Sequence, residues 1–186
     1  MSEKSPVVPT MLKREESVLV VIDIQEKLMP TIAESKRVIQ NTARLLQFAK
    51  IIDLPVILSE QDKLGATVPE IKQELTGCNP AIKITFDALL CEAFAEGLQR
   101  LNRKAIILTG VETHVCVTQT ALHALPDYAV HVVSDAVSSR TQENWRVGLE
   151  RMRQHGAVIT STEMVMFELL KRAGTDEFKK VLPLVK

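Results

Sequence analysis

The sequence has few aromatic residues and no excess of charge of either sign. Phe, Trp and Tyr make up 4% of the 186 residues, and Lys plus Arg equal Asp plus Glu at 23 each. A formal net charge of zero gives no electrostatic reason to expect a nucleic acid or an anionic membrane as partner. Few rings are present on which bases could stack. We therefore expect neither nucleic acid nor membrane among the partners.

Cysteine is scarce as well, and long apolar runs are absent. The sequence has three cysteines, Cys78, Cys91 and Cys116. An odd number of cysteines without a Cys-x-x-Cys pair is typical of a protein in a reducing compartment. The stretch MSEKSPVVPTMLKREES has no apolar signal-peptide core. No apolar run approaches the ~18 residues of a membrane span. These features predict a cytoplasmic protein.

What the sequence does contain is an alternation of short apolar runs and helical periodicity. Strands are expected at 17–23, 54–60, 81–86, 105–110, 129–135 and 157–160, and helices at 36–53, 91–101, 113–125, 142–155 and near the C-terminus. Runs that are apolar throughout are typical of parallel sheets covered on both faces. We predict one three-layer α/β/α domain over 1–186 with a mostly parallel six-stranded sheet in the Rossmann-like order 3-2-1-4-5-6, and a flexible tail at 1–13.

That strand order brings two chemically useful residues together. Ligands of such sheets bind beyond the carboxyl ends of the strands, where the strand order reverses. Asp23 ends the first strand, and Cys116 follows the fourth strand by a short turn. The topology therefore predicts an acid and a thiol in one crevice.

Each candidate residue allows two interpretations. If Thr113 caps a helix, Cys116 lies in its first turn, where free amides and the helix dipole favour a nucleophilic thiolate and could hold an oxyanion. A lone helical cysteine can equally be inert core. Asp23 could exchange protons or cap a turn. Lys83 interrupts an apolar run and either reaches solvent from an edge strand or points into a polar site.

Other candidates carry less weight. His114 lies two residues before Cys116, a spacing that does not bring side chains together on a helix. Cys91 lies on an apolar helix face, and Cys78 lies in a loop. The four histidines have no metal-ligand spacing, and no glycine-rich phosphate loop is present, so we expect no metal and no cofactor.

Three stretches in this order resemble the isochorismatase-like cysteine hydrolases, from about residue 14 to residue 170. The stretch VLVVIDIQEKLMP resembles the opening strand of the family, and IKITFDAL resembles its lysine motif. The stretch LTGVETHVCVTQTALHAL, followed by VSDAVSSR, resembles its nucleophile motif. Together, at this spacing, the three are strongly specific.

The resemblance implies a catalytic triad of Asp23, Lys83 and Cys116. Asp23 takes the thiol proton and later helps to protonate the leaving group, while Lys83 holds the carboxylate and the thiolate in place. The resemblance also implies a cis peptide between Val111 and Glu112, which directs the amides near Val115 and Cys116 into the site.

Differences from the motifs of individual subfamilies indicate which branch of the family the sequence resembles. True isochorismatases usually lack the cysteine, and nicotinamidases carry metal-binding histidines where this chain reads LSEQDKLGATVPEIK. The sequence is most similar to the zinc-free isochorismatase domain-containing branch. Asp87 stands where a small Ser is common in the lysine motif, and an extra acid there could alter either the charge around Lys83 or the wall of the pocket.

The implied activity is hydrolysis of a small amide, ureido or related acyl C–N bond through an acyl-cysteine. The alternative is a scaffold, interaction protein or thiol redox sensor on the same fold; a nucleic-acid enzyme is disfavoured by the neutral charge. Gln25, Gln61, Asp87 and Glu112 are candidate substrate contacts. Family members assemble as dimers, tetramers or larger rings, and the apolar residues at 164–170 could serve such an interface or pack on the sheet.

Overall fold

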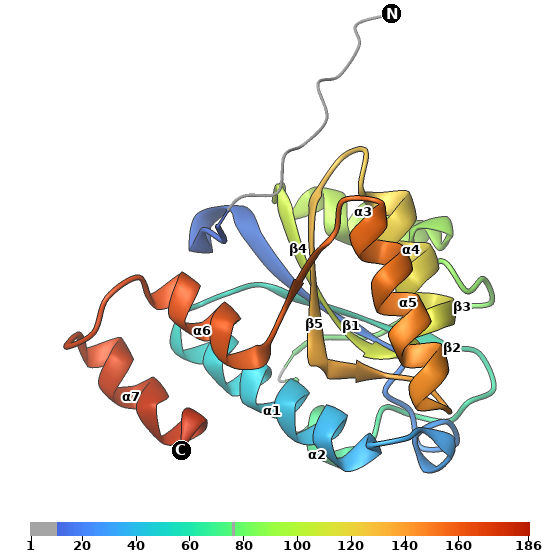
Figure 1. The fold of residues 1–186 in the computed structure, drawn as a ribbon, viewed down its shortest axis with the longest axis horizontal. Helices are drawn as coiled ribbons and strands as arrows, with labels where there is room; N and C mark the ends of the chain where they lie inside the picture. The colour runs from blue at the N-terminus through green and yellow to red at the C-terminus, as the bar shows by residue number, and fades with distance from the viewer. Residues whose placement is uncertain (1–10, 76) are drawn as a thin grey trace, which may run out of the picture.

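A parallel sheet forms the centre of the molecule. In the computed structural model, which describes residues 11–75 and 77–186, six strands run in the order β3-β2-β1-β4-β5-β6 (Figure 1). The strands are β1 (Ser17–Ile22), β2 (Val56–Gln61), β3 (Ala81–Lys83), β4 (Ala105–Val111), β5 (Ala129–Ser138) and β6 (Val158–Thr160). The predicted parallel sheet and its strand order are confirmed.

Helices cover the sheet on both sides (Figure 1). One side carries α1 (Ser35–Ile51), α2 (Pro69–Lys72), α6 (Thr162–Leu170) and α7 (Asp176–Val185), and the other carries α3 (Glu92–Arg100), α4 (Thr118–Ala124) and α5 (Gln142–Gln154). Short 3₁₀ turns occur at η1 (Arg14–Glu16), η2 (Met29–Thr31) and η3 (Ala88–Leu90), and a π-helical turn, η4 (Thr113–Val117), precedes α4.

Two apolar clusters form the core, one on each side of the sheet. The side chains of Leu19 and Val21 in β1 belong to the cluster under α1, while those of Val18, Val20 and Ile22 belong to the cluster under α3, α4 and α5. Successive side chains of a strand point to opposite faces, so a strand buried on both faces is apolar at most of its positions. This explains why the strand runs do not alternate with polar residues.

Strand ends differ from the prediction where pairing partners begin or end. β3 stops at Lys83 rather than at 86, because it pairs only with β2, whose last residue, Gln61, lies opposite Lys83. β5 extends past 135 because its pairing with β4 changes register between Leu108 and Gly110, after which Val111 pairs with Ser138. A sequence run does not reveal where a neighbouring strand ends.

The N-terminal boundary also needs correction. Residues 1–10 of the expected tail lie outside the described residues, but Leu12 is buried in the core beneath α1. Its N–H donates to Glu168 Oε2 at 3.0 Å. The packed domain therefore begins before residue 14.

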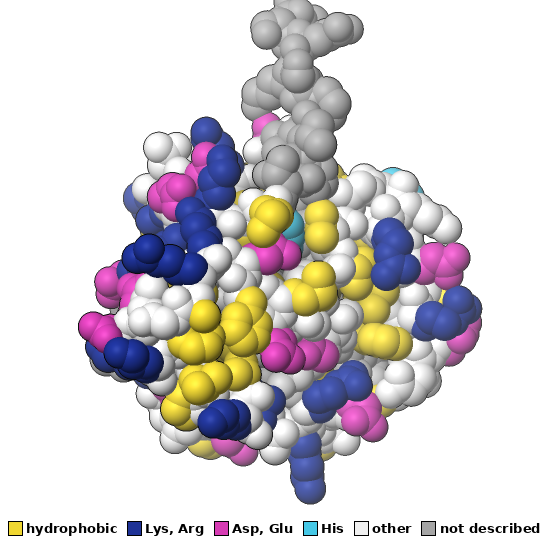
Figure 2. Space-filling model, turned by 60° about the vertical axis from the view of Figure 1, so that its left-hand side comes forward, with side chains coloured by type: hydrophobic (Ala, Val, Ile, Leu, Met, Phe, Trp, Pro, Cys, Tyr) yellow, Lys and Arg dark blue, Asp and Glu magenta, His cyan; other side chains and the backbone are white. Residues whose placement is uncertain are grey.

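Most of the apolar segment 164–170 packs on the core of the domain. Four of its side chains are buried in the core: Val165, Met166, Leu169 and Leu170. Met164 and Phe167 stay exposed, at 52% and 41%. Hydrophobic side chains gather beside Lys and Arg on the face that α6 and α7 turn toward the viewer in Figure 2.

Candidate active site

Asp23 follows the last residue of β1 and is fully buried. Its backbone has a positive φ of 51°, and its N–H donates to Ser59 O at 3.2 Å. The Ser59 hydroxyl donates to Asp23 Oδ1 at 2.7 Å. β2 therefore holds the carboxylate of Asp23 through both its backbone and a side chain.

Lys83, the last residue of β3, is 2% exposed and points into the same polar centre. Its Nζ donates to Asp23 Oδ2 at 2.6 Å and to Gln61 Oε1 at 2.7 Å. The carbonyl oxygen of Thr85 lies 3.2 Å from Nζ, and the Cys116 sulfur lies 3.7 Å away. A buried ammonium needs such partners because the loss of hydration is otherwise uncompensated.

Cys116 lies in η4, and 6% of its surface is exposed. The π-helical turn is closed by the Glu112 carbonyl oxygen, which accepts the N–H of Val115 at 3.0 Å and of Val117 at 3.2 Å. The Val115 amide, expected among the oxyanion donors, is therefore engaged within the turn. The helix expected to begin near residue 113 begins instead with this wider turn.

The end of β4 passes very close to the end of β1. Gly110 has a φ of 108°, and a Cβ on it would lie 2.0 Å from the carbonyl oxygen of Ile22. Only glycine permits this approach, since any side chain would overlap the backbone of β1. One residue further on, the peptide bond between Val111 and Glu112 is cis. Gly110 is paired with Ile22, the residue before Asp23, and η4 begins three residues after Gly110.

The thiol of Cys116 is held in its protonated form. Burial, together with the negative charge of Asp23, raises its pKa to about 12, and the ammonium of Lys83 offsets only part of that rise. The turn at the start of a helix was expected to favour a thiolate. In the folded protein desolvation outweighs that effect, so the sulfur needs a base before it can act as a nucleophile.

Gln25 and Gln61, expected as substrate contacts, bind the protein itself. Gln25 donates through Nε2 to the carbonyl oxygens of Gln61 and Gly65, at 2.9 and 2.7 Å, and its Oε1 accepts the Gln61 N–H at 2.7 Å. The Gln61 side chain bridges Lys83 and the carbonyl oxygen of Ile84, at 3.0 Å from the latter. Both side chains therefore order the backbone around Lys83.

Glu112 and Asp87 are engaged in the same way. Glu112 Oε2 accepts the backbone N–H and the Nε–H of Arg140, at 3.0 and 3.1 Å. Asp87 accepts the Leu89 N–H at 2.9 Å and faces His123 Nδ1 at 2.6 Å. Neither carboxylate is hydrogen-bonded to Lys83 in the structure.

Two partners of the polar centre were missed from the sequence. Ser59 and the carbonyl oxygen of Thr85 contact Asp23 and Lys83, respectively. A small polar residue in the apolar run 54–60, on the strand beside Asp23, was the available signal for Ser59. Thr85 contacts Lys83 through its backbone carbonyl oxygen, which every residue type has, so the sequence gives no signal for this contact.

The remaining candidates stay apart from the polar centre. His114 Nδ1 pairs with Ser139 Oγ at 3.0 Å rather than with Cys116. Within residues 11–75 and 77–186, no group of three or more His, Cys, Asp or Glu side chains is arranged to hold a metal ion.

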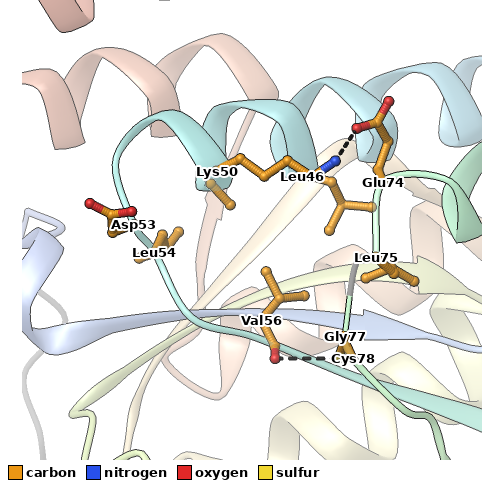
Figure 3. A pocket seen from close by; sticks show the side chains of 10 residues that line it. Leu46, Lys50, Asp53, Leu54, Val56, Glu74, Leu75, Gly77 and Cys78 are labelled. Atoms are coloured by element: carbon orange, nitrogen blue, oxygen red, sulfur yellow. Dashed lines mark hydrogen bonds and ion pairs between the residues drawn. The ribbon is translucent and has the colours of Figure 1, made fainter.

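A cavity of about 460 Å³ lies between α1 and the segment before β3 (Figure 3). Val56 lines it together with Leu54, Leu75 and Cys78, and the Lys50–Glu74 ion pair stands at its side. Val56 begins β2, whereas Gln61, at the other end of the strand, binds Lys83. The cavity therefore opens at the opposite end of the strands from Asp23, Lys83 and Cys116.

A sequence model of the isochorismatase domain matches residues 17–164. The chain belongs to the isochorismatase family. It is 41% identical over 179 residues to the secreted isochorismatase effector Isc1 of Phytophthora sojae, covering 91% of this chain and 84% of that protein. It is 37% identical over 176 residues to mouse isochorismatase domain-containing protein 2A, covering 92% and 84%.

Solved isochorismatase-fold structures superpose closely on the chain. A structure described as the MAR1 ribonuclease of Caenorhabditis elegans matches with a TM-score of 0.89 and 33% identity over 95% of this chain and 92% of that one. The YcaC protein of Escherichia coli, described as an octameric hydrolase of unknown specificity, matches with a TM-score of 0.87 and 25% identity, covering 97% and 92%. The fold is that of isochorismatase-family hydrolases.

Among the helices of residues 11–75 and 77–186, none has the length and hydrophobicity that a membrane span requires.

Proposed function

We propose that this protein is a cysteine hydrolase of small amides, ureido compounds or related acyl C–N compounds. One observation carries the proposal: the ammonium of Lys83 lies 2.6 Å from the Asp23 carboxylate and 3.7 Å from the Cys116 sulfur. An acid, a cation and a thiol buried together at the carboxyl ends of parallel strands form a nucleophile with its base and its charge stabiliser.

The first half of the reaction makes an acyl-cysteine. Asp23 accepts the thiol proton as the Cys116 sulfur bonds to the carbonyl carbon, and the carbonyl oxygen becomes an oxyanion. When the oxyanion collapses, the C–N bond breaks and the proton on Asp23 passes to the leaving nitrogen. A thiol with a pKa of about 12 needs such a base, because it supplies almost no thiolate at neutral pH.

The second half releases the acid. Asp23, ionised again, takes a proton from water as the water oxygen attacks the thioester carbon. The C–S bond then breaks, and the sulfur recovers the proton from Asp23. Lys83 keeps its positive charge throughout and stabilises whichever of the carboxylate and the thiolate is charged.

Oxyanion binding is assigned to the backbone of η4 and the residues before it. We place the Cys116 N–H nearest to the developing charge, with Val111 and Glu112 shaping the turn. An oxyanion would have to compete with the Glu112 carbonyl oxygen for the Val115 N–H. The small exposed fraction of Cys116, 6%, favours a slender substrate.

The assembly and location of the protein are part of the proposal. A homo-oligomer, a dimer or larger, is supported by the description of the E. coli neighbour as octameric. Three free thiols are consistent with a reducing cytoplasm. The Phytophthora relative is described as secreted, so location is to be measured by fractionation and assembly by sedimentation.

Two other functions are weaker candidates. A thiol redox sensor needs an accessible sulfur of low pKa, and Cys116 is buried with a raised pKa. Ribonuclease activity is suggested by the description of the C. elegans neighbour, but the zero net charge offers no general attraction for a polyanion. Incubation with labelled RNA tests it directly.

The proposal is tested by intact-protein mass spectrometry after incubation with a panel of small amides, carbamoyl compounds and aldehydes. We expect a covalent adduct, an acyl-cysteine from an amide or carbamoyl compound or a thiohemiacetal from an aldehyde, that is absent in Cys116→Ser and present in Cys78→Ser and Cys91→Ser. Asp23→Asn should slow its formation, because the base is removed. If no compound gives an adduct and Cys116 reacts with iodoacetamide no faster than Cys78, the proposal fails.

A further inference from the structure

The loop that follows β3 is attached to α4 at two points. The Asp87 carboxylate oxygen Oδ2 lies 2.6 Å from His123 Nδ1, and the Ala88 N–H donates to Thr120 Oγ1 at 3.0 Å. Since an ionised carboxylate only accepts hydrogen bonds, the histidine carries its proton on Nδ1. Asp87 and Ala88 belong to the loop, and Thr120 and His123 belong to α4.

Each side of this contact supports one part of the candidate active site. On the loop side, Thr85 Oγ1 donates to the Asp87 carbonyl oxygen at 2.9 Å, and the Thr85 carbonyl oxygen accepts from Lys83 at 3.2 Å. On the other side, α4 continues directly from η4, which carries Cys116. The contact between Asp87 and His123 therefore connects the segment that binds the Lys83 ammonium to the helix that follows Cys116.

Asp87 makes this contact with an oxygen that serine does not have. Its Oδ1 caps the short turn η3 by accepting the Leu89 N–H at 2.9 Å, which leaves Oδ2 for His123. A serine, the residue common at this place in the lysine motif, has a single shorter oxygen. It could cap the turn, but it could not also reach the imidazole.

We propose that Asp87 and His123 are positioning residues that hold the Lys83 ammonium beside the Cys116 thiol. The inference rests on the proposed function, in which Lys83 stabilises the Cys116 thiolate. The Asp87 side chain is 10% exposed and that of His123 is 50% exposed. Solvent screens the imidazole side of the contact, so we expect the contact to affect the reactivity of Cys116 more than the stability of the fold.

The test uses four variants and reads the thiol directly. Asp87→Ser keeps a cap for η3 and removes the contact, while His123→Ala removes the contact and keeps the cap. The double variant completes a coupling cycle, and His123→Gln restores a donor that can reach Asp87. His155→Ala is the matched control, since His155 is an exposed histidine at the end of another helix.

All variants are made in a Cys78→Ser, Cys91→Ser background, and two quantities are measured against pH: the rate of Cys116 alkylation by iodoacetamide and the ultraviolet absorbance of its thiolate. We expect each single variant to slow alkylation at neutral pH by about threefold to tenfold, the scale of one charge-assisted hydrogen bond. At a given alkaline pH, each single variant should show less thiolate absorbance than the parent protein. The double variant should be no slower than the slower single variant, and His123→Gln should recover most of the rate.

The inference is overturned if both single variants match the parent, if their effects multiply in the double variant, or if only the melting temperature changes. Failure of the proposed function is a separate result. If no compound of the panel gives an adduct with the parent protein and Cys116 reacts with iodoacetamide no faster than Cys78, the proposed cysteine hydrolase mechanism fails. The comparison of variants in the alkylation cycle needs no substrate and still reports whether Asp87 and His123 position Lys83.

Discussion

The ammonium of Lys83 lies 2.6 Å from the carboxylate of Asp23, although 60 positions in the chain separate the two residues. Asp23 follows β1 and Lys83 ends β3, with β2 between them in the sheet. Ser59 and Gln61, on that middle strand, contact Asp23 and Lys83, respectively. The side chains at the end of β2 therefore orient the Asp23 carboxylate and the Lys83 ammonium toward each other.

Replacement of Lys83 by Met should weaken the nucleophile. The Lys83 charge lowers the Cys116 pKa, so its loss should raise that pKa further and move thiol alkylation to higher pH. The rate at neutral pH should fall by about tenfold or more, since one pKa unit is a factor of ten in thiolate. Lys63→Met, at an exposed position, is the control. An unchanged or lower midpoint in a folded Lys83→Met protein would contradict the prediction.

The pH dependence of unfolding should report the buried thiol. The Cys116 pKa is about 12 in the folded protein, against 9.0 for an unperturbed cysteine. Because the folded state holds the proton more tightly, this group contributes stability below about pH 9 that is lost as the pH rises toward 12. The free energy of unfolding in urea should fall more steeply above pH 9 in the parent protein than in Cys116→Ala. Burial also raises the pKa of Cys78, so both proteins carry Cys78→Ser. Parallel curves would show that Cys116 does not titrate as described.

Gly110→Ala should be among the most damaging small substitutions. The added Cβ would overlap the Ile22 carbonyl oxygen, 2.0 Å away, at a φ of 108°. We expect a loss of about 3 kcal/mol or more in unfolding free energy, combining backbone strain with overpacking. Gly156→Ala is the control, because its φ of 101° is also positive but nothing lies within 4 Å of the new atom. It should cost only about 1 kcal/mol. Equal losses in the two variants would rule out the close approach of β4 to β1.

Gly148→Ala should affect acylation more than stability. A Cβ there would lie 3.1 Å from the His114 backbone, in the turn that carries Cys116. Alanine favours a helix by about 1 kcal/mol over glycine, which offsets part of the crowding. We expect acyl-adduct formation to slow severalfold while the melting temperature changes by only a few degrees.

Gly97→Ala, in α3, is the matched control for that experiment. Its new atom would lie 3.0 Å from Ile57 Cδ1, the end of a flexible side chain that can move aside. Acylation in Gly97→Ala should match the parent. Equal slowing in both variants would show that the effect does not come from the contact with His114.

The sequence alone determined the frame of the site. Continuous apolar runs require a sheet covered on both faces, and such a sheet is parallel with its ligands at the carboxyl ends of its strands. That reasoning placed Asp23 and Cys116 in one crevice before any side-chain position was known. Lys83, the third residue of the predicted triad, was identified only through the resemblance of its motif to the family. In the structure Lys83 pairs with Gln61 at the end of β2, which places it at the same edge of the sheet.

The tertiary structure decided what each polar side chain binds and which protonation state it favours. Gln25 and Glu112 face backbone groups and Arg140 rather than open space, because their directions depend on register and turn geometry. The same geometry engages the Val115 amide in the π-helical turn. Burial raises the Cys116 pKa, and burial depends on every element packed around the thiol. Local patterns in a sequence specify which strands and helices form, whereas hydrogen-bond partners and desolvation arise only when distant segments come into contact.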